Sequence, residues 1–208
     1  MCSRLTTVVV FYGVRMSESG PPRGREDVQH ALIVAATKLF SAHGPAAVSV
    51  RQIAKEAGVN HGLVHRHFGS KDQLLRAVLN HLANEVSRAV GPGEADESLY
   101  DLIRPLMHST EGGDGHWLRI IARSILDGHN VEDLQDHFPM TDRVIAAARR
   151  EQKGPLDPEA RVSFIMSVGL GMLLFEPFLR IATGQDEAQW ERTRAQILGL
   201  AMQSKSNP

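Results

Sequence analysis

The sequence predicts an all-α protein, with a small three-helix domain near the N-terminus and a larger helical domain after it. Three observations carry this prediction. Two short amphipathic segments flank a glycine between residues 49 and 69, apolar residues recur at helical spacing through most of the later chain, and no strand-like alternation appears after residue 20. The boundaries we expect are 1–22 for a disordered extension or misassigned start, 23–75 for the first domain and 76–208 for the second.

The first short helix is predicted to begin after Ser49. Its hydroxyl can accept a hydrogen bond from a free amide in the first turn, which makes serine a good N-cap. Val50, Ile53, Ala54 and Ala57 then follow at helical spacing and share one face. The two small alanines on that face would let a second helix approach closely.

The second short helix is predicted after a turn at Gly58, where glycine adopts a left-handed backbone at little cost. Asn60 can cap this helix, and Val64 and Phe68 lie four residues apart, pointing inward. The remaining surface carries short apolar, imidazole and guanidinium groups, at His61, Leu63, His65, Arg66 and His67. Such a face suits the major groove of duplex DNA better than bulk water, so the segment is predicted to be a helix-turn-helix.

The third helix is predicted to begin at Ser70, directly after Gly69. Ser70 and Gln73 have the spacing of a capping box. Lys71 falls in the first turn, where the helix dipole disfavours a cation slightly. A nearby phosphate would reverse that penalty, since free amides and a lysine together bind anions well.

With these motifs, residues 26–75 resemble the DNA-binding domain of the TetR family, the tetracycline-repressor-like bacterial regulators. EDVQHALIVAATKLFSAHG matches the opening helix of the family, and HFGSKDQLL is the most specific piece. The resemblance implies a cytoplasmic, ligand-responsive repressor, not an enzyme, with an all-α fold: an N-terminal helix-turn-helix DNA-binding domain and a C-terminal helical ligand-binding and dimerisation domain. His65 stands where the family usually has a tyrosine that touches a phosphate.

The DNA contacts are predicted residue by residue. His61, Leu63 and Arg66 are expected at base edges, and Leu63 in particular suggests a thymine methyl or readout by DNA shape. Arg51, His65, His67 and Lys71 are expected near phosphates, with Ser49 and Asn60 at the helix starts. The partner is a double-stranded, pseudo-palindromic DNA operator.

Charge and composition agree with this division. Residues 23–90 carry nine Lys/Arg and five Asp/Glu, a formal charge of +4, whereas residues 91–208 carry twelve and eighteen, a formal charge of −6. Because Cys2 is the only cysteine, no disulfide can form within the chain. Residues 1–15 lack a convincing signal-peptide cleavage site, and no other segment is expected to have the unbroken apolar length of a membrane span.

The later helices are predicted from apolar spacing and breaks at glycine and proline. We expect HNVEDLQDH to be a polar connection, Asp157 with Pro158 to start a helix, and Pro177 to kink or interrupt it. The expected helices are 70–89, 97–110, 116–127, 139–152, 158–183 and 186–202.

The last two helices are predicted to form a homodimer surface rather than ordinary core. Glycine costs helix stability, about 1 kcal/mol relative to alanine, and close helix contact would offset that cost at Gly169 and Gly171. A dimer also presents two recognition helices about 34–36 Å apart, or a multiple of that spacing. The interface residues we expect are Gly169, Gly171, Trp190, Ile197, Leu198 and Ala201.

A cavity for a small-molecule effector is implied by the resemblance. Methionine and aromatic side chains adapt to varied apolar guests, which favours a lipophilic effector. The alternative interpretation is ordinary core for the apolar residues and a surface position for the polar ones. The candidate lining residues are Met107, Trp117, Ile121, Phe138, Met140, Phe164, Met172 and Phe175, with His116 and Arg123 as polar anchors.

Two alternatives stay open. The chain could keep the fold as a non-DNA-binding ligand carrier or interaction module. A metal-dependent enzyme is the weaker alternative: His61 and His65 are spaced four apart, but no nearby acid completes a ligand set. No phosphate-binding glycine loop or nucleophile motif appears, so we expect no cofactor and no metal.

Overall fold

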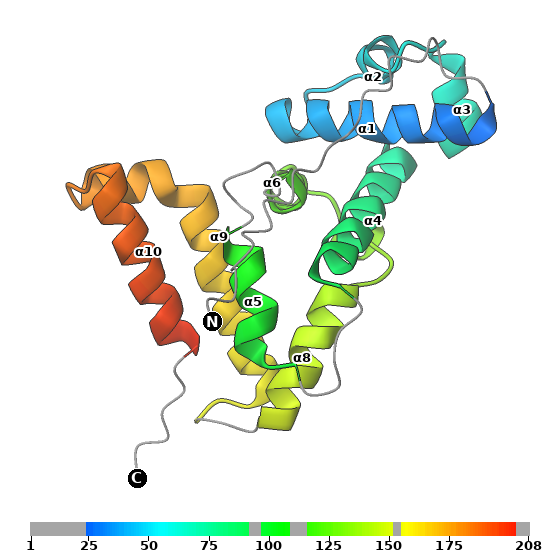
Figure 1. Ribbon diagram of the computed structural model, residues 1–208. Helices are drawn as coiled ribbons and strands as arrows, with labels where there is room; N and C mark the ends of the chain where they lie inside the picture. Colours follow the sequence, from blue (N-terminus) through cyan, green and yellow to red (C-terminus); the bar gives the residue numbers. More distant parts are fainter. Residues whose placement is uncertain (1–23, 92–96, 109–115, 152–154, 203–208) are drawn as a thin grey trace, which may run out of the picture. The chain divides into compact units, whose positions relative to one another are not determined.

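The computed structural model describes residues 24–91, 97–108, 116–151 and 155–202, without the side chains of residues 89, 104–108 and 202. These ranges contain ten helices and no strand (Figure 1). The expected extension at residues 1–22, and the side chain of Met107, lie outside the described residues. The helices are α1 Arg25–His43, α2 Val50–Glu56, α3 Gly62–Phe68, α4 Lys71–Val90, α5 Leu99–His108, α6 His116–Leu126, α7 Val131–Leu134, α8 Pro139–Glu151, α9 Pro158–Ala182 and α10 Glu187–Met202.

The all-α prediction is confirmed, and two local predictions need correction. The stretch expected to be a polar connection contains the four-residue helix α7, because Leu134 is buried and anchors it to the core. A helix this short has no apolar period for sequence reasoning to detect. The helix α9 continues through Pro177, so the predicted interruption is wrong, and a kink is the predicted alternative that stays open. At its start, Asp157 caps the helix as predicted, with its carboxylate accepting from the amide of Ala160 at 2.7 Å.

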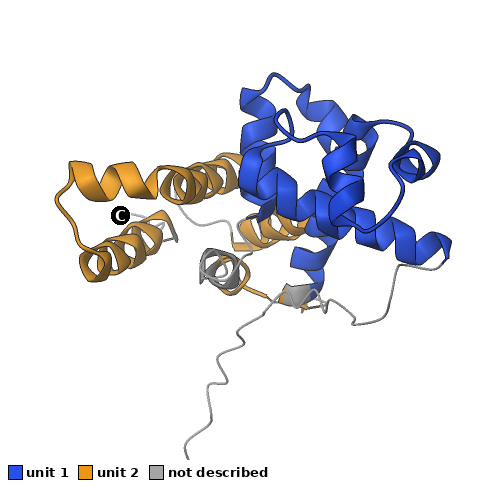
Figure 2. Ribbon diagram, turned by 90° about the horizontal axis from the view of Figure 1, so that it is seen from above, with its two compact units in different colours: residues 1–89, 111–138 blue, residues 90–110, 139–208 orange. Residues whose placement is uncertain are grey.

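The chain forms two compact units, residues 1–89 with 111–138 and residues 90–110 with 139–208 (Figure 2). The first unit therefore contains α6 and α7 in addition to the predicted N-terminal domain. Compactness in space and a boundary between functions are different properties, so the functional boundary at residue 75 stays a prediction.

The core of the first unit is built on α1. Leu32, Ala36 and Phe40 of this helix are fully buried, together with Ile53 of α2 and Val64 of α3. These are the inward positions that helical spacing predicts for α2 and α3. The core also takes in the apolar face of α4 and Ile120 of α6, so the helix-turn-helix rests on a scaffold wider than three helices.

A row of polar side chains along α4 holds the segment that follows α6. Asp72, Arg76, Asn80 and Asn84 are spaced by four residues and therefore share one face. Arg76 donates to the carbonyl of Glu132 at 3.1 Å, and the Asn80 carbonyl oxygen accepts from the backbone amide of Asp136 at 3.1 Å. The Nε2 atom of His129 lies 3.8 Å from the Asp72 carboxylate, and the Nε2 atom of His137 lies 3.1 Å from the side-chain oxygen of Asn84. The row joins α4 to residues 129–137 over most of its length.

In the second unit, α8 and α10 both pack against α9, and α5 packs against α8. The inward face of α9 carries Val162, Ile165, Gly169 and Met172, which are buried. Trp190 of α10 is 2% exposed and packs with Met172 and Leu198 in one apolar cluster. The apolar core between α9 and α10 is therefore formed within a single chain.

The opposite face of α9 is apolar and exposed. Phe164, Phe175, Phe178 and Ile181 are 50%, 58%, 67% and 84% exposed. Among the described helices, α9 alone is long and apolar enough to cross a membrane by length and composition, with a mean hydropathy of 1.8 over 18 residues. The expectation that no segment reaches that length is therefore wrong for α9.

Candidate nucleic-acid interface

The first half of the interface is α2 with the turn that ends it. Ser49 caps α2 by accepting from the amide of Gln52, and the Gln52 side chain accepts from the amide of Ser49 at 2.8 Å. Sequence reasoning predicted the cap and missed the reciprocal glutamine, although its position three residues after Ser49 is the capping-box signal. At the other end, Gly58 has a φ of 67°, and the amide of Val59 donates to the carbonyl of Ala54 at 2.9 Å. This pattern is a Schellman motif, which needs the left-handed residue that glycine supplies.

The second half is α3, which begins one residue later than Asn60 alone suggests. The side-chain oxygen of Asn60 accepts from the amide of Gly62 at 2.8 Å and fixes the start of the helix. Val64 is buried beneath it, whereas His61, His65 and Arg66 are exposed. On α2, Arg51 is exposed as well. The structure thus brings two imidazoles and a guanidinium together on the outward surface of one short helix.

A hollow of about 370 Å³ lies between α3 and the first turn of α1. Leu63 and His67 line it from α3, and both are only partly exposed. Leu63 also packs against the apolar core. These two side chains therefore face α1, whereas His61 and His65 do not line the hollow. The full lining is Gly24, Arg25, Val28, Leu63, Arg66 and His67.

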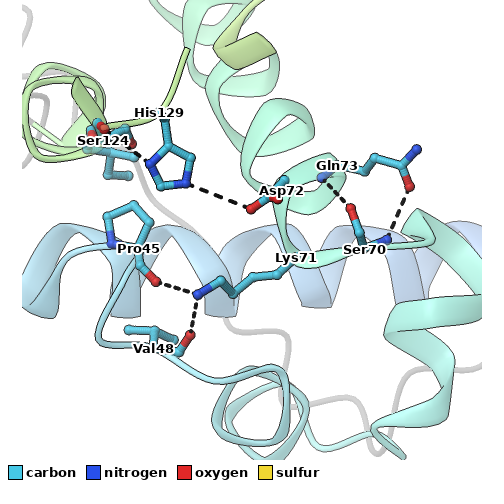
Figure 3. A network of polar contacts seen from close by, with 9 residues as sticks. Pro45, Val48, Ser70, Lys71, Asp72, Gln73, Ser124 and His129 are labelled. Carbon is cyan, nitrogen blue, oxygen red and sulfur yellow. Dashed lines mark hydrogen bonds and ion pairs between the residues drawn. The ribbon is translucent and has the colours of Figure 1, made fainter. Parts of the chain in front are cut away.

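At the edge of the interface, the Lys71 side chain forms hydrogen bonds to the backbone of its own chain. Its amine donates to the carbonyls of Pro45 and Val48, at 3.0 and 3.3 Å (Figure 3). These carbonyls belong to the loop just before α2, so Lys71 braces the loop that leads into the helix-turn-helix. The predicted capping box is present beside it, with the Gln73 amide donating to the Ser70 hydroxyl at 3.1 Å.

A second contact in Figure 3 links α4 to the end of α6. The Nδ1 atom of His129 lies 3.1 Å from the carbonyl oxygen of Ser124, and its Nε2 atom lies 3.8 Å from the Asp72 carboxylate. Nearby, the Arg123 guanidinium donates to the carbonyl of Ser41 near the end of α1, at 3.0 Å. Both contacts tie α6 to the DNA-binding helices. The sequence holds no motif that would have revealed them, because the partners lie far apart along the chain.

The residues predicted for the dimer interface fall into two groups. Trp190, Leu198 and Ala201 are buried within a single chain, as is Gly169, and Ile197 packs against the same cluster. Gly171 differs, because a Cβ atom added to it would meet nothing within 4 Å. Of the predicted set, Gly171 belongs to the side of α9 that carries the exposed phenylalanines.

The residues predicted for the effector pocket are divided between the two units. In the first unit, Trp117 donates to the side chain of Gln135 at 3.0 Å, and Ile121 packs against the core around α1. His116 keeps a buried Nδ1 atom without a hydrogen-bond partner. Burial, with a smaller contribution from Arg119, lowers the pKa of His116 below its usual value, so the neutral imidazole is favoured. The Arg123 predicted as an anchor is engaged with Ser41, and Phe138 is exposed.

In the second unit, the predicted pocket residues also have different surroundings. Met140 and Met172 are buried, and Met172 packs against Trp190. Phe164 and Phe175 are exposed on α9. Within the described ranges, no cluster of three or more histidine, cysteine or acidic side chains could hold a metal ion.

The arrangement of α2, its glycine turn and α3 defines a DNA-binding protein of the helix-turn-helix class. Residues 32–78 match the family model described as bacterial regulatory proteins of the tetR family. The chain is 40% identical over 176 residues to the HTH-type transcriptional repressor Rv3405c of Mycobacterium tuberculosis, covering 85% of this chain and 88% of the relative. The chain therefore belongs to the TetR family of transcriptional regulators, which are DNA-binding proteins and not enzymes.

Solved structures share the same fold. A putative transcriptional regulator from Rhodococcus sp. RHA1 is 20% identical with a TM-score of 0.57, covering 86% of this chain and 97% of that one. A putative TetR-family regulator from Vibrio parahaemolyticus is 19% identical with a TM-score of 0.53, covering 85% and 97%. At these identities the likeness supports the fold alone.

Proposed function

We propose that this regulator is a cytoplasmic repressor that occupies a pseudo-palindromic operator as a homodimer and leaves it when a small lipophilic effector binds. The observation that carries the DNA-binding part is the outward face of α3, where His61, His65 and Arg66 are exposed above the buried Val64. Repression is supported by the 40% identical relative, whose name describes it as a transcriptional repressor. The competing proposal is a helical ligand-binding module that does not bind DNA.

We assign the DNA contacts by exposure. His61 remains a candidate for a base edge, since it lies at the start of α3, where a recognition helix reads bases. Arg66 remains a candidate because its long, exposed guanidinium can pair with a guanine edge even from the second half of the helix. Arg51 and His65 remain candidates for phosphates. Leu63 and His67 lean into the hollow beside α1, so we expect weaker contributions from them. Ser49 and Asn60 act as caps that orient the two helices.

The role that we propose for Lys71 differs from the phosphate contact predicted from the sequence. Its amine is engaged by two backbone carbonyls, so we infer that it positions the loop before α2, and that direct phosphate contact is secondary. A charge-assisted hydrogen bond of this kind is stronger than one between neutral groups. The loop carries Ser49, so the lysine acts on DNA binding through the start of α2.

The dimer surface we propose is the exposed side of α9 around Gly171. It carries Phe164, Phe175, Phe178 and Ile181, a stripe too apolar to stay in water. A second copy is the occupant we favour over a membrane, because α9 also buries its other face against α8 and α10 of its own chain. The open space around Gly171 would admit a closely approaching helix.

The effector part of the proposal rests on His116 and the polar row of α4. A neutral imidazole with a buried, unpartnered nitrogen can anchor one polar group of an otherwise apolar molecule. A shift of α6 would then act on α1 through Arg123 and on α4 through His129. By population shift, an effector that favours the shifted arrangement weakens operator binding.

The decisive experiment is selection of operators from random duplex DNA with the full chain, followed by footprinting of the recovered sequence. We expect a palindromic site protected at two half-sites about one DNA turn apart, or a multiple of that spacing. A chain that enriches no sequence and binds no duplex at low ionic strength would refute the repressor and leave the ligand-binding module.

The dimer is tested by Phe178→Glu, which places a charge in the middle of the apolar stripe. We expect sedimentation to show a monomer, with loss of operator binding. Leu126→Glu, at an exposed apolar position on α6, is the matched control and should stay dimeric. If Phe178→Glu sediments as the wild type does, the proposed surface is wrong, and vesicle flotation of the wild type would then identify a membrane as its occupant.

A further inference from the structure

The ring of His65 is fixed by a single backbone contact. Its Nδ1 atom lies 2.9 Å from the carbonyl oxygen of Gly69. A carbonyl oxygen can accept a hydrogen bond but cannot donate one, so the hydrogen of this bond belongs to Nδ1. The amide of Gly69 also donates to the backbone carbonyl of His65 at 2.9 Å, which fixes the turn that the ring contacts.

This contact decides what the other ring nitrogen can do. A neutral imidazole carries one N–H hydrogen, and here Nδ1 holds it, so Nε2 presents a lone pair. A lone pair repels a phosphate oxygen and cannot donate to it. A second proton turns Nε2 into a donor and gives the ring a positive charge, which creates a charge-assisted hydrogen bond to phosphate.

We propose that His65 binds a DNA phosphate only as the doubly protonated imidazolium, so that a neutral His65 ring must take up one proton to make this contact. The inference rests on the proposed operator binding through α3. A phosphate is the expected partner because His65 lies in the second half of α3, next to the turn into α4, whereas base edges are read from the start of a recognition helix.

Other charged and titratable groups surround His65 on α3 and α4. On α3, His61 lies one turn earlier, and Arg66 and His67 follow directly. On α4, Lys71 is engaged with the loop before α2.

The remaining groups of α4 near this turn are also accounted for. Asp72 pairs with His129, and the neutral Gln73 lies over Gly69. Among the residues that the structure describes, Gly69 is the single hydrogen-bond partner of the His65 side chain, and no carboxylate pairs with it. The negative charge that stabilises the imidazolium therefore comes from the DNA.

The test measures the affinity of the full chain for a fluorescent 40-base-pair duplex of fixed sequence between pH 6 and pH 8.5, at constant low ionic strength. Phosphate contacts do not depend on sequence, so this probe does not require the natural operator. For the wild type we expect Kd to rise with pH, by up to about tenfold per pH unit for each subunit. His65→Gln carries an amide donor that needs no proton, so its curve should be flatter and its affinity at pH 8.5 should be retained.

His43→Gln is the matched control, because it removes an exposed imidazole at the end of α1, outside the proposed DNA contacts, and should keep the wild-type slope. Equal slopes for the wild type and His65→Gln, with duplex binding intact, would overturn the inference while leaving operator binding in place. A slope lost in His43→Gln and kept in His65→Gln would overturn it as well. Absence of all duplex binding by the wild type at pH 6 would remove the proposed function together with the inference.

A second measurement does not depend on DNA. Nitrogen-15 NMR of the histidine rings in the free protein at pH 8.5 distinguishes the two neutral forms. We expect His65, assigned by the signal missing from His65→Gln, to carry its hydrogen on Nδ1. A hydrogen on Nε2 would overturn the inference.

Discussion

Replacing Lys71 with methionine separates a lysine that holds a loop from a lysine that binds DNA. Methionine keeps much of the apolar stem and removes the amine, so the carbonyls of Pro45 and Val48 lose their donor. A hydrogen bond to a charged group contributes roughly 1.5–3 kcal/mol. The site is only partly buried and both carbonyls can turn to water, so we expect less than the sum for two such bonds, about 2 kcal/mol for the pair of contacts.

That loss is large enough to measure. For a chain of this length, about 2 kcal/mol corresponds to a fall in Tm of about 4–8 °C. DNA binding should weaken as the loop before α2 loosens, with little change in its dependence on salt. A direct phosphate contact would instead lower the slope of log Kd against log salt by about 0.9 for each subunit.

The assay pairs thermal unfolding with a salt titration of duplex binding. Lys55→Met is the control, because Lys55 is exposed on α2 and its loss should leave Tm unchanged. Unchanged Tm in Lys71→Met, together with a salt slope reduced by about 0.9 for each subunit, would show that the lysine binds phosphate and that the positioning role is wrong.

Three further changes test separate features. Arg66→Ala should alter the base preference recovered by operator selection, and recovery of the unchanged operator would exclude base contact. Gly58→Ala should lower the free energy of unfolding by about 1–2 kcal/mol. The cost comes from the left-handed backbone alone, because a Cβ atom added there meets nothing within 4 Å. Gly184→Ala, at the same φ of 67°, should cost as much while leaving DNA affinity unchanged. Burial lowers the pKa of both His81 and His116 from 6.5, so the unfolded chain binds more protons than the folded chain. The free energy of unfolding, measured in urea, should therefore fall as the pH drops through 6.5. A free energy of unfolding that rises instead would contradict this prediction.

Local features of the helix-turn-helix were predictable because their causes are local. A cap at Ser49, a left-handed turn at Gly58 and a capping box at Ser70 each depend on residues within a few positions of one another. The inward placement of Val64 follows from helical spacing in the same way. Family membership follows too, since the most specific motif is contained in one continuous stretch.

Contacts between distant residues were not predictable in this way. The apolar stripe of α10 could indicate either a core or a subunit surface, and folding buries Trp190 against Met172 of the same chain. Which face of α9 then remains for a partner depends on where α8 and α10 pack, and no spacing rule contains that information.

The amino-acid sequence alone determined that the chain is helical, where most helices begin and end, and which residues form the helix-turn-helix. Tertiary structure alone decided that Lys71 meets the carbonyls of Pro45 and Val48, and that residues 129–137 lie along the polar row of α4. The physical reason is the separation along the chain between the residues that interact. Caps, turns and helical periods act between neighbours in the chain, whereas a lysine finds its acceptor only after folding has brought segments more than twenty residues apart within hydrogen-bonding distance.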